Sequence, residues 1–323
     1  MGVELKSLVT GGAGFIGSNL VEKLCGLGDE VVIIDNFSSG FKKNIEKLGI
    51  EVLEADIRDK EIINSKIFKN TDRIFHLAAN VDNRFSWDDP ELPVRSNIEG
   101  TLNVCLAARN NDVNQIVYSS TGTVYGDLPS PPYSEDRQTS DQTTLYGATK
   151  YSAEGLLSVF ATHYAISSTV FRFVGVLGPK TSHGHLFDFM RKLDKDPKEL
   201  KVLGNGYQKK AYVDVDDVVK ALIHTKKVKF DVFNVGRPDF STVRDSVRWL
   251  CEEMDIDPEI SYENTDKGWI GDNPTLYLNV EKILNTGWQP TYTIENSVKR
   301  TVRWLSENLW ILRQSKRHIG GPE

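Results

Sequence analysis

The chain has 323 residues and a net charge of -6, from 39 Lys and Arg against 45 Asp and Glu. This balance argues against a nucleic-acid or membrane-surface protein, because such proteins usually carry a basic patch. The length exceeds what a single hydrophobic core usually holds, and it predicts one large domain or two interlocked ones.

No segment has the pattern of a targeting or membrane-spanning element. The first residues lack a charged region followed by a long apolar run, so no signal peptide is expected, and no stretch approaches the length of a membrane span. The three cysteines, Cys25, Cys105 and Cys251, are far apart and odd in number. They predict neither a disulfide framework nor a zinc site, and a reduced, cytoplasmic setting is expected.

The N-terminal half alternates strand and helix patterns. Leu8-Val9-Thr10 predicts a short strand, and apolar residues at helical spacing from Ile16 to Leu27 predict the helix that follows it. Further strands are predicted at 31–34, 51–53, 73–77, 115–118 and 168–173, with helices at 97–109 and 146–164. Unbroken apolar strands in repeated β-α units imply a parallel sheet covered on both faces, a doubly wound α/β fold.

A helix near the C-terminus carries an apolar stripe that indicates core packing rather than a cofactor site. The stripe comprises Ile294, Val298, Val302 and Leu305.

A glycine-rich segment joins the first strand to the first helix. Gly11 allows the turn, Gly14 lets the backbone approach a pyrophosphate, and Gly17 permits close packing of the helix. The helix N-terminus supplies free N–H groups and a positive dipole end for phosphates. Asp35 ends the next strand and would accept from ribose hydroxyls while repelling a 2′-phosphate, which favours NAD over NADP. Asp35 could instead merely begin the turn at Asn36–Gly40.

Tyr146 and Lys150 are one turn apart on a predicted helix, so the ammonium lies on the tyrosine's face. A tyrosine hydroxyl has an ordinary pKa of about 10 and stays protonated at neutral pH. A nearby cation favours the phenolate and brings the tyrosine toward the working range of an acid–base catalyst. Alone, such a pair is more often a surface contact. The surrounding motifs favour a catalytic pair here.

These motifs, in this order, resemble the extended short-chain dehydrogenases/reductases of the nucleotide-sugar epimerase/dehydratase group. The segment Thr10–Gly17 resembles the group's Gly-x-x-Gly-x-x-Gly cofactor turn, and Tyr118–Gly126 resembles its Ser-Ser-x-x-Val-Tyr-Gly segment. Tyr146 and Lys150 match its catalytic pair. The resemblance runs nearly end to end, through Asp56-Ile57, His76–Ala79, Asn97, Arg172–Pro179, Lys209–Val219, Phe233–Gly236 and Gly287-Trp288.

The resemblance implies two interleaved parts. Residues 1–179 are expected to form an NAD-binding Rossmann domain, to which 212–236 returns. A smaller C-terminal α/β substrate-binding cap is expected from 180–211 and 237–312, followed by a frayed tail over 313–323.

The resemblance also implies NAD as cofactor and assigns roles to single residues. Tyr146 is expected to take a sugar hydroxyl proton, Lys150 to hold the nicotinamide ribose and stabilise the phenolate, and Thr121 to position the sugar oxygen. A strand-end threonine can instead satisfy its own backbone. The expected NAD contacts are Gly11, Gly14, Phe15, Ile16, Gly17, Asp35, Asn36, Ser38, Asp56, Ile57, Leu77, Ala78, Ala79, Asn97, Ser119, Tyr146, Lys150 and Phe173.

The expected substrate contacts are Thr121, Gly122, Thr123, Gly175, Lys180, His185, Lys210 and Trp269. Several depart from the family pattern. Gly175 replaces an asparagine, and Lys210 stands where an arginine is typical, which keeps the charge but loses the bidentate fork. Trp269 replaces a second arginine, and it could stack on a base or sugar or simply pack in the cap. Arg84 could face the sugar or be an exposed loop cation. No metal site is expected, because His183 and His185 are too few.

Gly122 and Thr123 bear on the reaction type. Dehydratases and decarboxylases of the group carry an acid before the Val-Tyr-Gly, and removing water from a keto sugar needs both a base and an acid. These two residues supply neither, so dehydration is disfavoured. We expect an NAD-dependent epimerase that inverts C4 of a nucleotide-diphosphate sugar through a transient 4-keto intermediate.

The alternatives are a nucleotide-sugar reductase or an epimerase acting at another carbon, with a 4,6-dehydratase or a non-catalytic NAD-binding regulator less favoured. No nucleic-acid or membrane partner is expected. A homodimer is expected, because relatives often pair through the helices near Asn97 and Tyr146.

Overall fold

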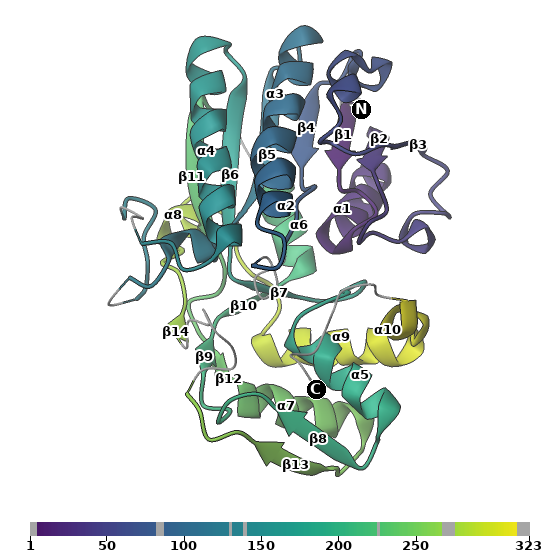
Figure 1. Ribbon diagram of the computed structural model, residues 1–323, viewed down its shortest axis with the longest axis vertical. Coiled ribbons are helices and arrows are strands. Elements are labelled where there is room, and N and C mark those ends of the chain that lie inside the picture. The colour runs from purple at the N-terminus through teal and green to yellow at the C-terminus, as the bar shows by residue number, and fades with distance from the viewer. Residues whose placement is uncertain are drawn as a thin grey trace.

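The computed structural model describes residues 5–81, 87–128, 131–137, 141–224, 227–266 and 275–314. Figure 1 shows a layered upper part, in which a sheet is covered by helices, above a smaller lower part. The sheet has seven parallel strands in the order β11-β6-β5-β4-β1-β2-β3. Its strands are β1 (Lys6–Thr10), β2 (Glu30–Asp35), β3 (Glu51–Glu54), β4 (Arg73–His76), β5 (Gln115–Thr121), β6 (Ser167–Phe173) and β11 (Phe230–Val235). The expected doubly wound parallel sheet is confirmed.

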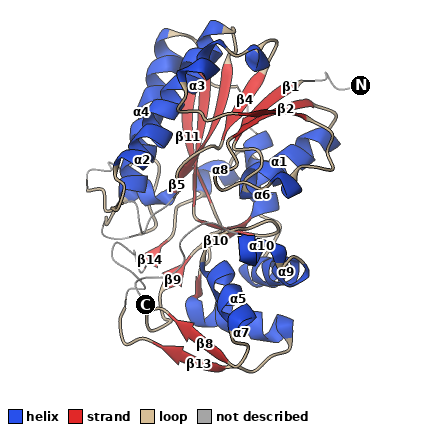
Figure 2. Ribbon diagram, turned by 45° about the vertical axis from the view of Figure 1, so that its right-hand side comes forward, coloured by secondary structure: helices blue, strands red, loops and turns tan. Residues whose placement is uncertain are grey.

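The strands are unbroken in apolar character because both faces of the sheet are covered. Along β1, Val9 faces one core while Leu8 faces the other, and Ile33 and Val32 of β2 alternate in the same way. Helices α1 (Phe15–Gly26) and α6 (Val215–Ile223) cover the first face, and α3 (Gly100–Asn110) and α4 (Leu145–His163) cover the second, as Figure 2 shows.

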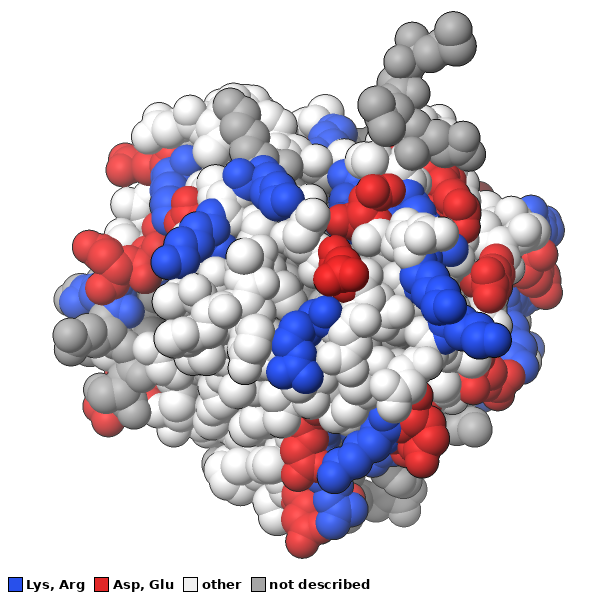
Figure 3. Space-filling view, turned by 90° about the horizontal axis from the view of Figure 1, so that it is seen from above, with Lys and Arg blue, Asp and Glu red and all other residues white. Residues whose placement is uncertain are grey.

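Short helical segments connect these layers. They are η1 (Lys42–Asn44), η2 (Lys60–Asn64), η3 (Lys66–Phe68), α2 (Glu91–Val94), the single π-helical turn η4 (Arg95–Glu99) and η5 (Gly122–Tyr125). In the described ranges, no helix is both long and apolar enough to cross a membrane. The face in Figure 3 carries Lys and Arg interspersed with Asp and Glu, rather than a field of one sign.

The lower part has a core of its own. It is built from α5 (His185–Lys195), α7 (Val243–Met254), α9 (Ile294–Glu307), α10 (Trp310–Gln314), β8 (Glu199–Val202) and β13 (Glu259–Tyr262). The apolar stripe of α9 lies in this core, as the sequence predicts. Three short strands, β9 (Lys209–Lys210), β12 (Ser241–Thr242) and β14 (Thr275–Leu276), form a separate sheet, and β7 (Gly175–Leu177) pairs in parallel with β10 (Tyr212–Asp214).

One segment lies elsewhere than expected. Leu278, Ile283 of α8 (Glu281–Leu284) and Trp288 belong to the core beneath the large sheet, together with Val235 of β11. The indole Nε1 of Trp288 also donates to the carbonyl of Asp217 at 3.0 Å. This apolar segment therefore packs on the upper part, although the sequence places it within the cap. The other domain boundaries stay a prediction.

A buried ion pair ties helix α4 to the sheet. Arg172 of β6 donates from Nη2 to Glu154 Oε2 at 2.7 Å and from Nε to Oε1 at 3.1 Å, and the two side chains are only 5% and 4% exposed. Ser120 of β5 donates to Glu154 Oε1 at 2.5 Å. Arg172 Nη1 bonds the Tyr125 hydroxyl, which donates to Asn234 of β11. The pair thus links α4, β5, β6 and β11 through one set of satisfied polar groups.

Replacing Arg172 with leucine should lower the free energy of unfolding by about 3–5 kcal/mol, because it leaves the Glu154 carboxylate buried without its counter-ion. Urea denaturation would measure the loss. The control is Arg95→Leu at the exposed Arg95–Glu91 pair, whose members are 58% and 71% exposed. That change should cost less than about 1 kcal/mol. Equal losses for the two variants would contradict the structural role of the buried pair.

Candidate active site

The carboxyl ends of the central strands meet the start of helix α4. Thr144 begins this helix, since its hydroxyl accepts from the Gly147 backbone N–H at 3.0 Å. Tyr146 and Lys150 then lie one turn apart in its first turns, as predicted. Thr121 ends β5, the strand next to them, and precedes η5. The three residues expected to form the catalytic set therefore come from two adjacent elements.

The Lys150 ammonium is buried and has no ionic partner in the described part of the chain. The residue is 1% exposed, and among the described residues its Nζ forms neither a hydrogen bond nor an ion pair. Its contact is with the ring of Tyr118, whose centroid lies 4.0 Å from Nζ. Burial lowers the pKa of Lys150 to about 7, against the opposing charge of Glu154. An unpaired ammonium with three donors fits a ligand rich in hydroxyls, as the ribose of NAD is.

Thr121 is engaged with its own loop. Its Oγ1 accepts from the Thr123 backbone N–H at 3.1 Å and lies 3.0 Å from Thr123 Oγ1. The backbone-capping role considered for this threonine is therefore present in the structure. Rotation of the two hydroxyls would let Thr123 donate to Thr121, which leaves the Thr121 proton available to a third oxygen. Its role toward a sugar stays a prediction.

The conformation of the glycine turn is suited to binding a phosphate. Gly11 has a φ of +72°, which a residue with a side chain rarely adopts. A Cβ on Gly17 would lie 2.1 Å from Gly11 O, so the first turn of α1 can sit this close to the loop only as glycine. The first N–H groups of any helix have no partner within the helix, and among the described side chains none caps those of α1. These groups fit the pyrophosphate of NAD.

Asp35, which is expected to bind the ribose of NAD, forms hydrogen bonds within the protein. Its carboxylate accepts from Ala13 N–H in the glycine turn at 2.9 Å and from Phe37 N–H at 2.8 Å, and burial raises its pKa. The turn-initiating role considered for Asp35 is thus seen. Asn36 donates to Asp56 Oδ2 at 2.7 Å. The Arg58 side chain bonds Asp56 through two nitrogens and, against burial, lowers the pKa of that carboxyl to about 2.

A buried polar chain holds the end of β4. The Thr10 hydroxyl bonds His76 Nδ1 at 2.7 Å, and His76 Nε2 bonds the Thr101 hydroxyl at 2.9 Å. Thr10 accepts from Ala78 N–H, while Thr101 donates to the Asn97 carbonyl, so the neutral ring carries its proton on Nε2. Burial, with the charge of Lys150, lowers the pKa of His76 to about 3. The chain fixes the backbone of Leu77, Ala78 and Ala79, where the cofactor is expected.

Asn97 acts on this loop through the protein. Its side-chain amide donates to the Asn80 carbonyl at 2.9 Å and to Thr149 Oγ1 at 2.9 Å, and its oxygen accepts from Asn80 N–H at 2.8 Å. All of these bonds are internal. Asn97 is therefore placed to position the loop after β4 against α4, and its contact with a cofactor stays a prediction.

The other expected cofactor residues have mixed settings. Ile57 packs in the core under α3, and Phe15 and Phe173 are buried on the α1 side. Ile16 is partly buried there, the Ser38 N–H bonds Asn36 Oδ1, and the Ser119 hydroxyl donates to the His76 carbonyl. These residues border the glycine turn and the strand ends, so the structure gathers the expected set around one edge of the sheet.

Among the expected substrate residues, Gly175 lies in β7 and His185 begins α5, where the chain passes from the upper to the lower part. A Cβ on Gly175 would be 2.6 Å from the Tyr212 ring, so this ring occupies the space of the asparagine side chain typical there. Tyr212 in turn lies against the His185 ring, with centroids 5.0 Å apart and an interplanar angle of 30°. Lys210 lies in β9, next along the chain. Trp269 and Arg84 lie outside the described residues.

Two further expected contacts have protein partners. Lys180 Nζ donates to Glu22 Oε2 of α1 at 2.7 Å, so binding a phosphate there would require this pair to open. Gly122 is buried, and a Cβ on it would be 3.3 Å from the Phe173 carbonyl. This position therefore has little room for the acidic side chain of a dehydratase.

The sequence alone did not predict the buried residues that pack around the candidate site. Glu154, Tyr118 and Thr149 make contacts with Arg172, Lys150 and Asn97 that no local pattern specifies. A signal was present, because Arg172 is a charged residue inside an otherwise buried strand and needs an acidic partner nearby.

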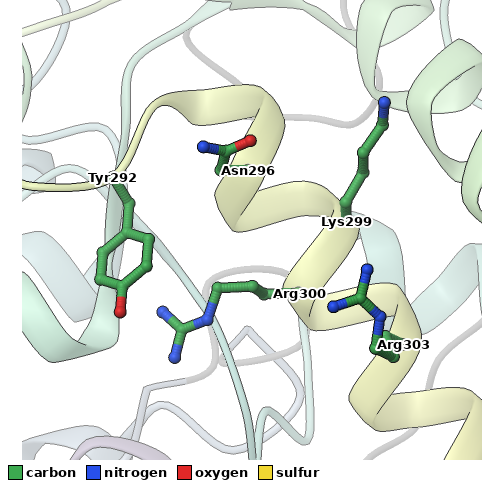
Figure 4. A pocket seen from close by; sticks show the side chains of 5 residues that line it. All are labelled: Tyr292, Asn296, Lys299, Arg300 and Arg303. Atoms are coloured by element: carbon green, nitrogen blue, oxygen red, sulfur yellow. The ribbon is translucent and has the colours of Figure 1, made fainter.

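A separate cavity of about 240 Å³ lies on α9, away from these residues. Its lining side chains are Tyr292, Asn296, Lys299, Arg300 and Arg303 (Figure 4). The cations there already have acidic partners in Glu252, Glu295, Asp214, Asp216 and Glu253. We assign it no function.

Comparison with known proteins matches residues 7–236 to the NAD dependent epimerase/dehydratase family. A putative UDP-glucose 4-epimerase from Methanocaldococcus jannaschii is 32% identical over 306 residues, which cover 93% of this chain and 98% of the relative. The structure of Thermotoga maritima UDP-glucose 4-epimerase with UDP-glucose has a TM-score of 0.86 at 32% identity, covering 94% of this chain and 100% of that chain. That of Thermus thermophilus UDP-glucose 4-epimerase in complex with NAD has a TM-score of 0.84 at 29% identity, covering 94% and 99%.

Gly17→Ala should lower both stability and the retention of NAD, since the added methyl group displaces α1 from the loop. We expect a loss of about 1–3 kcal/mol in the free energy of unfolding, and purified protein should contain less NAD, as measured by absorbance of the cofactor released on denaturation. The control is Gly26→Ala at the other end of the same helix, where an added Cβ meets no atom within 4 Å. That variant should keep its NAD and gain up to about 1 kcal/mol.

Proposed function

Since the chain belongs to the NAD-dependent epimerase/dehydratase family, we propose that it is an epimerase that inverts C4 of a nucleotide-diphosphate sugar and keeps its NAD between turnovers. The similar protein from Thermotoga maritima carries the name UDP-glucose 4-epimerase, and the one from Methanocaldococcus jannaschii is named a putative UDP-glucose 4-epimerase. The observation that carries the proposal is the buried Lys150 ammonium, which is unpaired within the described ranges and lies one helical turn from Tyr146.

The residues divide the acid–base work. Tyr146 takes the proton of the C4 hydroxyl as that carbon is oxidised, and it returns the proton when the ketone is reduced. Lys150 stabilises the phenolate that forms in between. Thr121 donates to or accepts from the same sugar oxygen and holds it toward Tyr146. When bound, NAD supplies a reversible hydride acceptor for the sugar carbon. Because the keto sugar rotates in the site before it is reduced, the configuration at C4 inverts and no net oxidation takes place.

The positions next to Thr121 argue against dehydration. A 4,6-dehydratase needs an acid for the leaving hydroxyl and a base for the acidic C–H. Thr123 carries a hydroxyl that is engaged with Thr121, and Gly122 has no side chain and little room for one. A reductase would be recognised by its consumption of NAD(P)H, and an epimerase acting at another carbon by the configuration of its product.

The residues expected to bind the substrate are compatible with a nucleotide sugar, although several of them differ from the family pattern. Gly175 lacks the amide of the usual asparagine, and the Tyr212 ring fills its place beside His185. Lys210 retains one positive charge for a diphosphate, without the planar fork of arginine. We therefore expect the diphosphate to be bound with less geometric selectivity. The rings of Tyr212 and His185 should contribute more to the binding of the substrate.

We also propose that the enzyme is a homodimer joined through α3 and α4. Tyr151, Gly155 and Val159 follow one exposed face of α4 at helical spacing, and the two larger side chains are 40% and 51% exposed. Leu102 of α3 is 36% exposed. Apolar side chains on adjacent helices form the kind of strip that pairs across a two-fold axis.

Tyr146→Phe should lower kcat by at least about a thousandfold, since it removes the proton carrier while keeping the ring. Turnover would be followed by NMR of the product from UDP-glucose, UDP-N-acetylglucosamine and UDP-glucuronate. NAD content serves as the control, and it should equal that of the parent enzyme. Undiminished turnover would rule out this mechanism. Consumption of added NAD(P)H in step with product would instead identify a reductase.

Val159→Arg should shift the protein from dimer to monomer, because a charge on the proposed interface has no partner and must be desolvated. Light scattering after size-exclusion chromatography gives the mass. The matched control is Leu27→Arg, at a side chain that is 56% exposed just after α1, across the sheet from α4. An unchanged mass for Val159→Arg would exclude pairing through this face.

A further inference from the structure

Tyr118 lies directly beneath the catalytic pair. It is a fully buried residue in the middle of β5, and its ring centroid is 4.0 Å from Lys150 Nζ. The His76 ring lies 5.4 Å from the Tyr118 ring at an interplanar angle of 35°. Tyr118 thus fills the space between the β4 end and helix α4, with its ring face toward the ammonium.

The groups around Lys150 leave the ring as its nearest stabilising contact. On α4, Glu154 is one turn further on, and its carboxylate is already bonded to Arg172 of β6 and Ser120 of β5. His76 of β4 is neutral, since its pKa is about 3. Burial raises the pKa of Cys105 of α3 to about 12, so this thiol is neutral too. Tyr146, one turn earlier on α4, is the proton carrier itself.

The tyrosine hydroxyl does not explain the residue. Tyr118 Oη lies near Thr101, but the Thr101 hydroxyl already donates to the Asn97 carbonyl and bonds His76. Among the described residues, Oη is therefore buried without a hydrogen bond of normal geometry. A buried, unsatisfied hydroxyl is destabilising. The feature that interacts favourably is the electron-rich face of the ring.

We propose that Tyr118 is a positioning residue of the active site, whose ring face holds the Lys150 ammonium charged and in place beside Tyr146. This inference rests on the proposed function, because it gives Lys150 the role of stabilising a phenolate. The face of an aromatic ring attracts a cation through its quadrupole, and the attraction strengthens when both are desolvated, as they are here. The contact costs no counter-charge, so it leaves the ammonium free to bind a hydroxyl-bearing ligand and to act on Tyr146.

The proposal has a defined pH signature. Burial lowers the pKa of Lys150 to about 7, and the ring opposes that shift by favouring the charged form. Weakening the ring contact must therefore lower the pKa further. The ammonium is present below its pKa and is lost as pH rises through it, so activity that depends on the ammonium should be lost at a lower pH.

The test changes ring electrostatics without changing ring shape. Tyr118→Phe keeps the electron-rich face and removes only the unsatisfied hydroxyl. Tyr118→pentafluorophenylalanine keeps the six-membered ring but reverses the sign of its face. NMR of isotope-labelled lysine, assigned with Lys150→Arg, gives the pKa of Lys150 in the purified protein, and the alkaline limb of kcat/KM gives it in the working enzyme. Thermal unfolding of each variant checks that it is folded.

Tyr118→Phe should leave both values unchanged, whereas the fluorinated ring should lower both by about one pH unit, a tenfold change in the ratio of ammonium to amine. Equal pKa values in the two folded variants would overturn the proposal. If the fluorinated variant does not fold, a series with one or two ring fluorines replaces it, and the pKa must fall with each added fluorine. The NMR titration does not require turnover, so it remains informative even if the protein proves not to be an epimerase.

Discussion

The Lys150 ammonium is buried, with no anion bonded to it among the residues that the structure describes, and the candidate active site is organised around this constraint. A desolvated charge is costly, and the usual remedy of a carboxylate at hydrogen-bond distance would occupy the donors that a ligand needs. The structure instead surrounds Lys150 with groups that stabilise it without capping it. The Tyr118 ring lies against it, and Glu154 acts from a distance while Arg172 and Ser120 hold that carboxylate in place. His76 is buried in neutral form and so adds no repulsion.

The parts predicted from the sequence were those encoded locally. Unbroken apolar strands require cover on both faces, so the parallel sheet followed from them, and the glycine spacing specified the turn before α1. Tyr146 and Lys150 share a helix face by spacing alone. The hydrogen-bonding partners of polar side chains could not be predicted in this way, because tertiary packing determines them. Asn97 illustrates this point, since its bonds to Asn80 and Thr149 depend on how a loop and two helices meet.

The assignment of one C-terminal segment to the cap was wrong for a similar reason. The apolar residues at Leu278, Ile283 and Trp288 fit either part of the molecule by pattern. Only the partner surface decides between them, and here that surface is the face of the large sheet near Val235. Thr121 and Asp35 show the complementary case, in which a predicted ligand contact also satisfies the backbone that presents it. Such residues have two roles, and sequence alone ranks these roles without excluding either.

The bonds between α1 and the segment after β7 have a consequence for how two ligands would be held relative to each other. Asn19 of α1 donates to the Pro179 carbonyl at 3.0 Å, and Lys180 reaches Glu22 on the same helix. Helix α1, whose first turn is proposed to receive the phosphates of the cofactor, is therefore bonded directly to the segment that leads to His185. These two bonds help to fix the distance between the glycine turn and the proposed substrate residues. A movement of the lower part that changed this distance would have to break the Asn19–Pro179 and Lys180–Glu22 bonds.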